Sequence, residues 1–369
     1  MLLEHTLLER VFYTPERFAQ EQVHRVESPR GQLLIASCRS GTYLAGRVVR
    51  RYAQSLIDGG DNGDVVYLED VDYNFSDQET GVRLQRDVSG YDVFLFQALY
   101  DPASNRNVDQ NYVAFLIAAR AFREWGANHV TAILPYLAYS RQDKPTKFSR
   151  EPTTAKFMAD ATLAAGVDRL VTWNPHSESI RGFYDNVPVN KLEALTLFVS
   201  VFGRFHGRDD VIAVAPDAGA SRLITHFGRA LDLNSAIASK YRPRPEQATI
   251  AEIIGDFTGK RIAIVLDDMI SSGGTVYALV QKLVVEKGIE EVYLGVSHYL
   301  GMDIAQKRLL ELHRDYHLME MIVTNSIPQP QTFEEVSFVS VYDLSDTFSR
   351  VINRIHYNRP VSELFYDEE

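Results

Sequence analysis

The sequence has little cysteine, little tryptophan and no excess of positive charge. Its one cysteine, Cys38, cannot form an intramolecular disulfide, a cysteine-based zinc site or an iron–sulfur cluster within one chain. Lys and Arg together number 38 against 49 Asp and Glu, a formal net charge of −11, so no broad nucleic-acid or anionic-membrane surface is expected. A local basic pocket for an anion remains compatible with this balance.

Long hydrophobic runs and a basic N-terminus are also missing. No apolar run approaches the roughly 18 to 20 residues that span a membrane. Glu4 and Glu9 stand where a signal peptide would carry basic residues. Together with the single cysteine, these absences predict a cytoplasmic protein with no membrane partner and no nucleic-acid partner.

What is present is enough apolar material for two domains. The 369 residues exceed what one compact core usually organises, and their 45% hydrophobic share excludes a disordered chain. Short runs rich in β-branched and aromatic residues predict buried strands. These runs lie at residues 33–36, 65–68, 93–96, 130–134, 170–173, 211–214, 262–266, 292–296 and 321–323.

Helical patterns lie between these strands. The clearest spans residues 109–125, where five apolar side chains have the spacing of a single stripe: Val113, Leu116, Ile117, Ala121 and Phe122. A second helix is expected at about 275–287. The alternation of strand and helix predicts an α/β fold of parallel sheets flanked by helices.

The strongest local signal is the stretch 262–275, in which a buried strand ends on Asp267 and Asp268 and a small-residue loop then opens a helix. The backbone N–H groups of such a loop, with the helix N-terminus behind them, form a cradle for a phosphate. The two carboxylates are placed beside it for sugar hydroxyls. The alternative is an ordinary turn with a solvated acidic pair, but adjacent charges after four buried residues are costly without a partner.

This stretch resembles the loop that binds 5-phosphoribosyl 1-diphosphate (PRPP) in type I phosphoribosyltransferases and ribose-phosphate diphosphokinases. Other segments match the diphosphokinase pattern in order: 75–79 (FSDQE), 139–144 (YSRQDK), 174–177 (NPHS), 215–219 (APDAG) and 240–245 (KYRPRP). The similarity runs from about residue 33 to residue 365. The sequence therefore resembles the ribose-phosphate diphosphokinase family.

The resemblance implies two α/β domains, each similar to a type I phosphoribosyltransferase core. The expected N-terminal domain is 1–187, with 1–30 an appended segment. The C-terminal domain is 188–344, carries the PRPP loop, and is followed by a segment, 345–369, that packs back onto the first domain. The implied reaction transfers the β,γ-diphosphoryl group of ATP to the C1 hydroxyl of ribose 5-phosphate, with Mg²⁺ as cofactor, and yields PRPP and AMP.

The resemblance also implies roles for individual residues. Catalytic cations are expected at Lys240 and Arg242, and Mg²⁺ positions at His176 and Asp217. ATP would be bound by Arg141, Gln142 and Asp143, together with Phe75, Asp77 and Glu79 of a neighbouring subunit, so a homo-oligomer is expected. Ribose 5-phosphate would be bound by Asp267, Asp268, Ser271, Ser272, Gly273, Gly274 and Thr275.

The residues themselves support these roles unequally. Arg141 and Gln142 follow a buried apolar stretch, where a guanidinium and an amide can bind polyphosphate or a purine edge; a solvated basic loop is the alternative. A single histidine such as His176, taken alone, is more often a structural residue than part of a metal site. Asp217 suits Mg²⁺ as a hard carboxylate, and it also suits a helix N-cap; both roles can hold at once.

Two other segments are less distinctive when taken alone. The segment 75–79 is an ordinary acidic turn without the family context. The segment 240–245 combines two prolines with three cations, which predicts an irregular, mobile loop or an exposed basic linker.

Some residues depart from the family pattern: Gln78 replaces the usual Gly, Asn174 the usual Asp, Ala220 a common second Gly, and Ser271 a frequent Asp. Two other functions therefore stay open. A phosphoribosyltransferase would need the PRPP loop but no ATP site, which the Arg141, Gln142 and His176 motifs argue against. A catalytically silent regulatory paralogue would be expected to lose the cations at 240 and 242.

Overall fold

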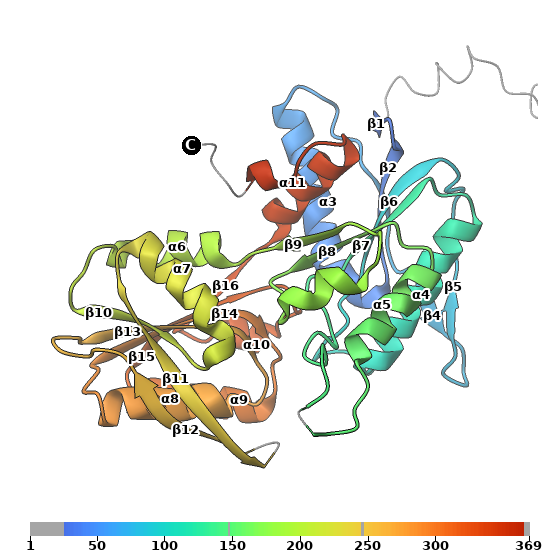
Figure 1. The fold of residues 1–369 in the computed structure, drawn as a ribbon. Coiled ribbons are helices and arrows are strands. Elements are labelled where there is room, and N and C mark those ends of the chain that lie inside the picture. Colours follow the sequence, from blue (N-terminus) through green and yellow to red (C-terminus); the bar gives the residue numbers. More distant parts are fainter. Residues whose placement is uncertain (1–25, 147, 245–246, 365–369) are drawn as a thin grey trace, which may run out of the picture.

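The computed structural model contains two mainly parallel β-sheets, each flanked by helices, and confirms the predicted α/β class (Figure 1). It describes residues 26–146, 148–244 and 247–364, and for 240–244 and 247–251 it describes the backbone alone. None of the helices in this part of the chain has the length and apolar character needed to span a bilayer.

The first sheet has the strand order β1-β2-β6-β7-β8-β9, with β3 also paired to β2. Every pairing is parallel except that of β1 with β2. β9 carries this sheet past residue 187, the predicted end of the N-terminal domain. β1 adds residues 27 and 28, which belong to the segment predicted to be appended. The domain limits remain a prediction. The strands are β1 (Glu27–Ser28), β2 (Gly31–Ser37), β3 (Val66–Leu68), β6 (Tyr91–Phe96), β7 (His129–Ile133), β8 (Arg169–Trp173) and β9 (Val189–Leu192).

The second sheet has the order β12-β11-β10-β13-β14-β15-β16 and is parallel except for β12. Because parallel strands end at the same edge of a sheet, Asp217 after β10 and Asp268 in β13 reach one edge. The strands are β10 (Val211–Ala215), β11 (Asn234–Arg244), β12 (Gln247–Ile254), β13 (Ile262–Ile270), β14 (Glu291–Tyr299), β15 (Leu318–Thr324) and β16 (Val339–Tyr342).

Strands β11 and β12 form an antiparallel hairpin, which corrects the expectation of irregular structure for residues 240–244; residue 245 lies outside the described part of the chain. Lys240 pairs with Ile250, and Arg244 pairs with Gln247. The pairing of the two strands shifts register between Tyr241 and Arg244. Pro243 lies within this irregularity, where it does not have to donate a backbone hydrogen bond to the neighbouring strand. Prolines at such an irregularity are compatible with a strand.

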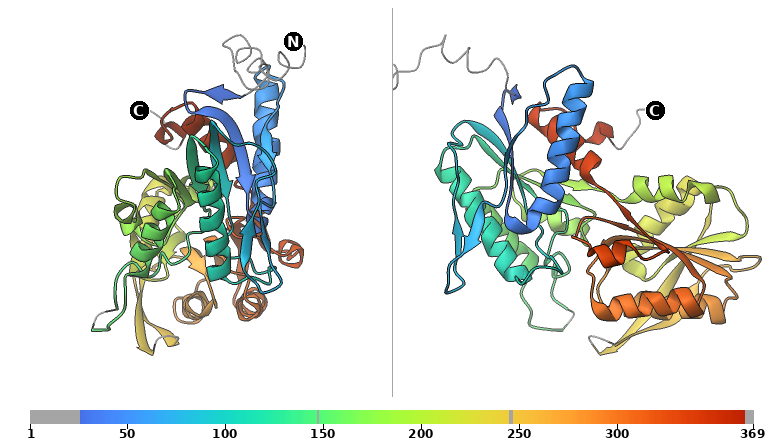
Figure 2. Two further views of the ribbon diagram at one scale, coloured as in Figure 1. Left: turned by 90° about the vertical axis from the view of Figure 1, so that its right-hand side faces the viewer. Right: turned by 180° about the vertical axis from the view of Figure 1, so that it is seen from behind.

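The helices cover both faces of the sheets (Figures 1 and 2). They are α3 (Thr42–Asp58), α4 (Val108–Glu124), α5 (Thr154–Ala164), α6 (Leu195–Val201), α7 (Ser221–Leu231), α8 (Gly274–Val285), α9 (Asp303–Asp315), α10 (Gln331–Glu334) and α11 (Ser345–His356).

Helix α4 confirms the predicted element but not its buried face. Val113 and Ile117 are 48% and 37% exposed, whereas Tyr112, Phe115 and Phe122 are buried. The apolar pattern was ambiguous because α4 carries apolar residues on more than one side. The side with the aromatic residues Tyr112, Phe115 and Phe122 is the one that is buried. The helix begins at a capping box formed by Asn107 and Gln110, which satisfies backbone N–H groups at its first turn.

One continuous apolar cluster connects the two sheets. Phe94 and Phe96 of β6, Val211 and Ala213 of β10, and Phe348 of α11 are all buried members of it. Apolar burial on this scale is the main favourable term in folding. The two sheets are therefore joined by a shared apolar core.

Helix α11 follows the last strand of the second sheet and returns to lie beside α3 of the first part of the chain (Figure 2). Beneath it, the Asp92 carboxylate accepts two hydrogen bonds of 3.0 Å from the Arg30 guanidinium and lies 2.8 Å from Nδ1 of His356. Asp92 and His356 have no solvent-exposed surface. This cluster fixes the N-terminal strand, β6 and α11 in one arrangement.

We expect Asp92→Asn to lower the free energy of unfolding by about 3–5 kcal/mol, because it leaves the Arg30 charge buried without a counterion. Urea unfolding measures the loss. Asp346→Asn is the matched control, since Asp346 also joins α11 to α3 through a 2.6 Å ion pair with Arg51, but with both side chains more than 40% exposed. The control should cost less than about 1 kcal/mol. Equal losses in the two variants would contradict a special role for the buried cluster.

Candidate functional site

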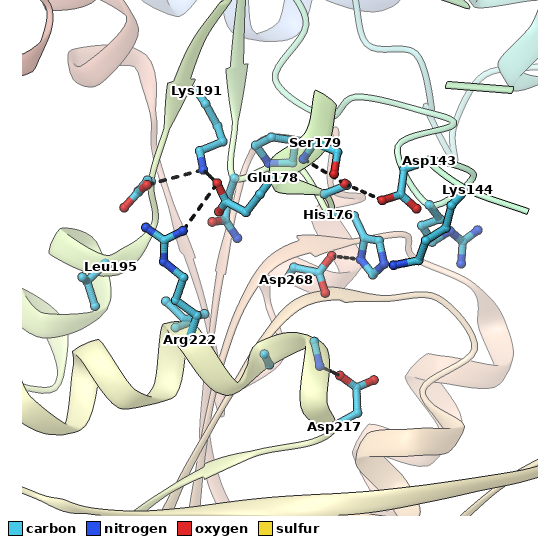
Figure 3. Close-up of a pocket in the computed structure, with 18 of the residues that line it drawn as sticks. Asp143, Lys144, His176, Glu178, Ser179, Lys191, Leu195, Asp217, Arg222 and Asp268 are labelled. Atoms are coloured by element: carbon cyan, nitrogen blue, oxygen red, sulfur yellow. Dashed lines mark hydrogen bonds and ion pairs between the residues drawn. The ribbon is translucent and has the colours of Figure 1, made fainter. Parts of the chain in front are cut away.

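A cavity of about 1020 Å³ lies between the two parts of the fold. One wall comes from the segments after β7 and β8, and the other from β13, α7 and the turn after β10. Figure 3 shows charged side chains converging on it from both walls. Five residues that the resemblance assigns to a site line this cavity: Arg141, Asp143, His176, Asp217 and Asp268.

The closest contact across the cavity joins His176 to Asp268. Nδ1 of His176 lies 2.6 Å from Oδ2 of Asp268, so a residue after β8 meets a residue of β13 (Figure 3). The hydrogen bond to Asp268 raises the pKa of His176, although burial acts in the opposite direction. A residue predicted for Mg²⁺ and one predicted for ribose 5-phosphate are thus paired directly.

Asp267 and Asp268 differ in electrostatic state despite being adjacent. Burial and the neighbouring Asp268 charge raise the pKa of Asp267 well above its usual range. Burial also acts to raise the pKa of Asp268, but the hydrogen bond and charge of His176, together with a hydrogen bond involving Asp267, outweigh it and the pKa is lowered. The two adjacent carboxyl groups therefore bind protons unequally, and Asp268 is the stronger acid.

Asp217 performs the N-cap role that the sequence left open. Its carboxylate accepts a 2.9 Å hydrogen bond from the backbone N–H of Gly219, at the start of a short 3₁₀ turn that leads into α7. The oxygen chemistry of this carboxylate suits Mg²⁺, which commonly uses one or two carboxylates plus water and substrate phosphates. No group of three or more His, Cys, Asp or Glu among the described residues could hold a metal. A magnesium ion here would therefore be shared with the substrate.

The segment after β7 contributes Arg141 and Asp143 to the cavity, while Gln142 does not line it. Asp143 accepts a 2.7 Å hydrogen bond from the hydroxyl of Ser177, which ties this segment to the one carrying His176. Gln142 uses its backbone to receive the N–H of Ala155 at the start of α5. The segment is thus anchored at both ends, and the Arg141 side chain is exposed to the cavity.

The segment containing Phe75, Asp77 and Glu79 forms a hairpin between β4 (Asp72–Asn74) and β5 (Thr80–Val82), away from this cavity (Figure 1). Phe75 is 50% exposed and packs edge-on against Tyr73. Within one chain the structure does not bring these three residues to the other predicted ATP residues.

The hairpin is anchored by a buried ion pair that the sequence analysis did not identify. Arg106 pairs with Asp72, and its Nε donates a 2.8 Å hydrogen bond to the side chain of Asn74. The side chains of Arg106 and Asp72 are 9% and 0% exposed. A rigid base therefore presents the exposed Phe75.

The predicted phosphate loop joins β13 to α8 as expected from the sequence. Gly273 has φ +74°, a left-handed conformation that glycine adopts without strain, and α8 begins at Gly274. Arg308 of α9 donates a 2.7 Å hydrogen bond to the carbonyl of Ser272. Sequence reasoning missed this cation because it lies over 30 residues further along the chain. Ser271, Ser272, Gly273, Gly274 and Thr275 do not line the cavity of Figure 3.

A second charged group in the cavity was also missed. Glu178 pairs with Lys191 of β9 and lies 3.8 Å from Arg222 of α7, so it too connects the two walls (Figure 3). These residues carried no motif in the sequence. For Lys240 and Arg242 the backbone belongs to β11, and their side chains lie outside the described part of the structure.

Comparisons with known proteins bear on this arrangement. Two family models match, the N-terminal domain of ribose phosphate pyrophosphokinase over residues 33–166 and the phosphoribosyl synthetase-associated domain over 226–366. The ribose-phosphate pyrophosphokinase of Clostridium acetobutylicum is 35% identical over 295 residues, which cover 80% of this chain and 88% of that protein. The chain belongs to the ribose-phosphate pyrophosphokinase family.

Other members of this family show similar agreement. Ribose-phosphate pyrophosphokinase A of Dictyostelium discoideum is 33% identical over 294 residues, 79% of this chain and 88% of that protein. The crystal structure of phosphoribosylpyrophosphate synthetase from Mycobacterium smegmatis matches with a TM-score of 0.74 at 29% identity, over 88% of this chain and 98% of that one. As a member of this family, the chain is an enzyme of the kinase class of transferases.

Two departures from the family pattern have a visible backbone consequence. Gln78, in place of the usual Gly, has φ +76°, and a residue with a side chain is strained there. Asn174, in place of the usual Asp, has φ +37°, which Asn tolerates comparatively well. The structure gives no such consequence for Ala220, and it places the hydroxyl of Ser271 3.5 Å from the sulfur of Met302.

The raised pKa of His176 predicts a pH-dependent contribution to stability. In buffer containing EDTA, the stabilising effect of the His176–Asp268 pair should be complete below a pH of about 6.5, the ordinary histidine pKa, and should disappear as the pH rises through the raised pKa. Melting temperatures of wild type and His176→Gln should differ most at acidic pH and converge at alkaline pH. His226→Gln, in the same cavity, is the control. A difference between wild type and His176→Gln that grows with pH would contradict the pairing.

Proposed function

We propose that this chain is a ribose-phosphate diphosphokinase, which transfers the β,γ-diphosphoryl group of ATP to the C1 hydroxyl of ribose 5-phosphate and gives PRPP and AMP. The observation that carries the proposal is the direct pairing of His176, expected at a Mg²⁺ position, with Asp268, expected to bind the sugar. Both substrates would then meet in one cavity. This juxtaposition supports a transfer between them rather than two separate binding functions.

In this proposal the sugar phosphate binds along the carboxyl end of β13. Asp267 and Asp268 accept hydrogen bonds from ribose hydroxyls, and the backbone of the loop 271–275 receives the 5-phosphate at the N-terminus of α8. The left-handed Gly273 turns this backbone, and Arg308 of α9 holds it through the Ser272 carbonyl. The loop is thus arranged before substrate arrives.

ATP binds opposite, with its phosphates near Arg141 and Asp143 and its base toward Gln142. Arg141 supplies the positive charge that polyphosphate requires. Phe75, Asp77 and Glu79 lie away from the cavity of their own chain, so we propose that they complete the nucleotide site of a neighbouring subunit in a homo-oligomer. The exposure of Phe75 on an anchored hairpin supports this role.

The residues present fit a magnesium ion shared between protein and nucleotide. We assign the protein contribution to Asp217 and His176, which line the same cavity. The hydrogen bond to Asp268 is the main cause of the raised pKa of His176, and the charge of Asp217 adds to it. When bound, Mg²⁺ would neutralise phosphate charge and orient the reacting groups. The chain itself provides positioning: it holds the C1 hydroxyl in line with the β-phosphorus and excludes water from the cavity.

Lys240 and Arg242 are proposed as the catalytic cations. Their backbone belongs to the β11–β12 hairpin, next to β10 at the edge of the second sheet. Cations placed here would act on charge that develops in the transition state. The family match over residues 226–366 includes this hairpin and supports the assignment.

We expect purified protein to form AMP and PRPP in equal amounts, and to do so in the presence of both ribose 5-phosphate and Mg²⁺. Chromatography of the nucleotides and a coupled assay of PRPP measure the two products. ADP in place of AMP would mean transfer of a single phosphoryl group and would contradict the proposal. Absence of product together with tight binding to an active relative would instead indicate a regulatory paralogue.

Asp267→Asn should weaken the use of ribose 5-phosphate by roughly ten- to a hundredfold, because a hydrogen bond to a charged group is worth about 1.5–3 kcal/mol. ATP binding should change little. The KM for ribose 5-phosphate and the Kd for Mg-ATP, measured on one preparation, test this. Arg141→Ala, in the same cavity, is the reciprocal control and should affect ATP more than the sugar. Equal losses for both substrates in Asp267→Asn would remove this carboxylate from the sugar site.

A further inference from the structure

A fully buried histidine lies directly behind the cavity. His298, in β14, is 2% exposed and contacts the segment that carries His176. Its Nε2 is 3.1 Å from the backbone carbonyl of Asn174, and its Nδ1 is 2.8 Å from the hydroxyl of Ser326. The ring of Tyr136 packs edge-on against it at 5.1 Å. No sequence motif pointed to this residue.

The partners of His298 determine where its proton lies. A carbonyl oxygen can only accept, so the Nε2 facing Asn174 must carry the hydrogen. A neutral ring then has a bare Nδ1, which accepts the hydroxyl hydrogen of Ser326. The Ser326 hydroxyl also lies 3.0 Å from the carbonyl of Ser297, which receives the hydroxyl of Thr324 at 2.6 Å. Because the contact with Nδ1 is shorter and that carbonyl already has a donor, the Ser326 hydrogen favours Nδ1 of His298. The link from Nε2–H of His298 to the Asn174 carbonyl is the same in either arrangement.

The surroundings keep this ring neutral. Burial lowers the pKa of His298 to about 4, and the charge of Asp268 opposes that shift without cancelling it. His176 also faces it from the first part of the fold and adds to the lowering. Near neutral pH the ring therefore donates one hydrogen bond and accepts one.

The acceptor end of this chain is a strained position. Asn174 has φ +37°, and its side-chain amide donates a 2.7 Å hydrogen bond to the hydroxyl of Ser297 in β14. Both the backbone and the side chain of Asn174 are thus held by β14. Two residues later the chain presents His176 to Asp268 at 2.6 Å. A backbone in the left-handed region costs free energy and persists because neighbouring groups fix it.

We propose that His298 is a positioning residue: through its Nε2–H it fixes the Asn174 carbonyl and so aims His176 across the cavity at Asp268. It touches neither substrate, and its role rests on the proposed function of that cavity. Its removal should lower kcat by on the order of ten- to a hundredfold, because the reacting groups would lose alignment. The KM values should change less than threefold, roughly, since no ground-state contact is lost.

Two substitutions separate this role from simple packing. His298→Leu removes both hydrogen bonds, whereas His298→Gln can still donate an amide N–H to the Asn174 carbonyl and should restore much of kcat. Thr324→Val is the matched control, because it removes two buried hydrogen bonds, one to the Ser297 carbonyl and one from the backbone N–H of Ser326, and leaves the His298–Asn174 bond in place. If Thr324→Val lowers kcat as much as His298→Leu at equal loss of melting temperature, or if His298→Gln is no better than His298→Leu, the proposal is wrong.

A spectroscopic measurement keeps the test independent of activity. In ¹⁵N-labelled protein without Mg²⁺, the His298 ring should carry its proton on Nε2, and the Nδ1–H signal of His176 bonded to Asp268 should be present. That His176 signal, assigned with His176→Gln, should disappear in His298→Leu and persist in His298→Gln and Thr324→Val. A proton on Nδ1 of His298, or a His176 signal unchanged in His298→Leu, would overturn the proposal. Failure of PRPP formation with these signals as expected would overturn the proposed function alone.

Discussion

The site depends on the cost of placing two carboxylates at the end of one buried strand. β13 is buried through Leu266 and then presents Asp267 and Asp268, which repel one another and lose hydration. The fold resolves this by giving Asp268 a histidine from the opposite wall while Asp267 holds a proton more readily. A substrate or metal that replaces His176 as the partner of Asp268 would thus exchange one favourable interaction for another, without exposing an uncompensated charge.

The sequence was sufficient for the elements that rest on local patterns. Strands β2, β6, β7, β8 and β10 are apolar runs bounded by turn residues, and each was predicted to within two residues of its observed limits. β13 and β14 run on to Ile270 and Tyr299, past the predicted ends at 266 and 296. The loop between β13 and α8 was also predictable, since glycine, small side chains and a following helix are adjacent in the chain. The cap formed by Asp217 followed from its place before α7.

What the sequence could not reveal are pairings between residues that only the tertiary fold brings together. His298 with Asn174, Glu178 with Arg222, and Asp92 with His356 are separated by 124, 44 and 264 positions. In the sequence alone, a charged residue such as Lys191 cannot be distinguished from an ordinary surface residue. The buried face of α4 was missed for a related reason: apolar residues on two sides gave a pattern that the facing sheet alone could resolve.

The apolar cluster shared by the two sheets also has a consequence for motion. A hinge that opened the cavity as two rigid bodies would separate buried side chains such as Phe94 and Val211, and it would expose apolar surface to water. Helix α11 follows β16 of the second sheet along the chain and packs against α3 of the first part of the fold. Opening the cavity by parting the two sheets therefore carries the free-energy cost of exposing the apolar surface they share.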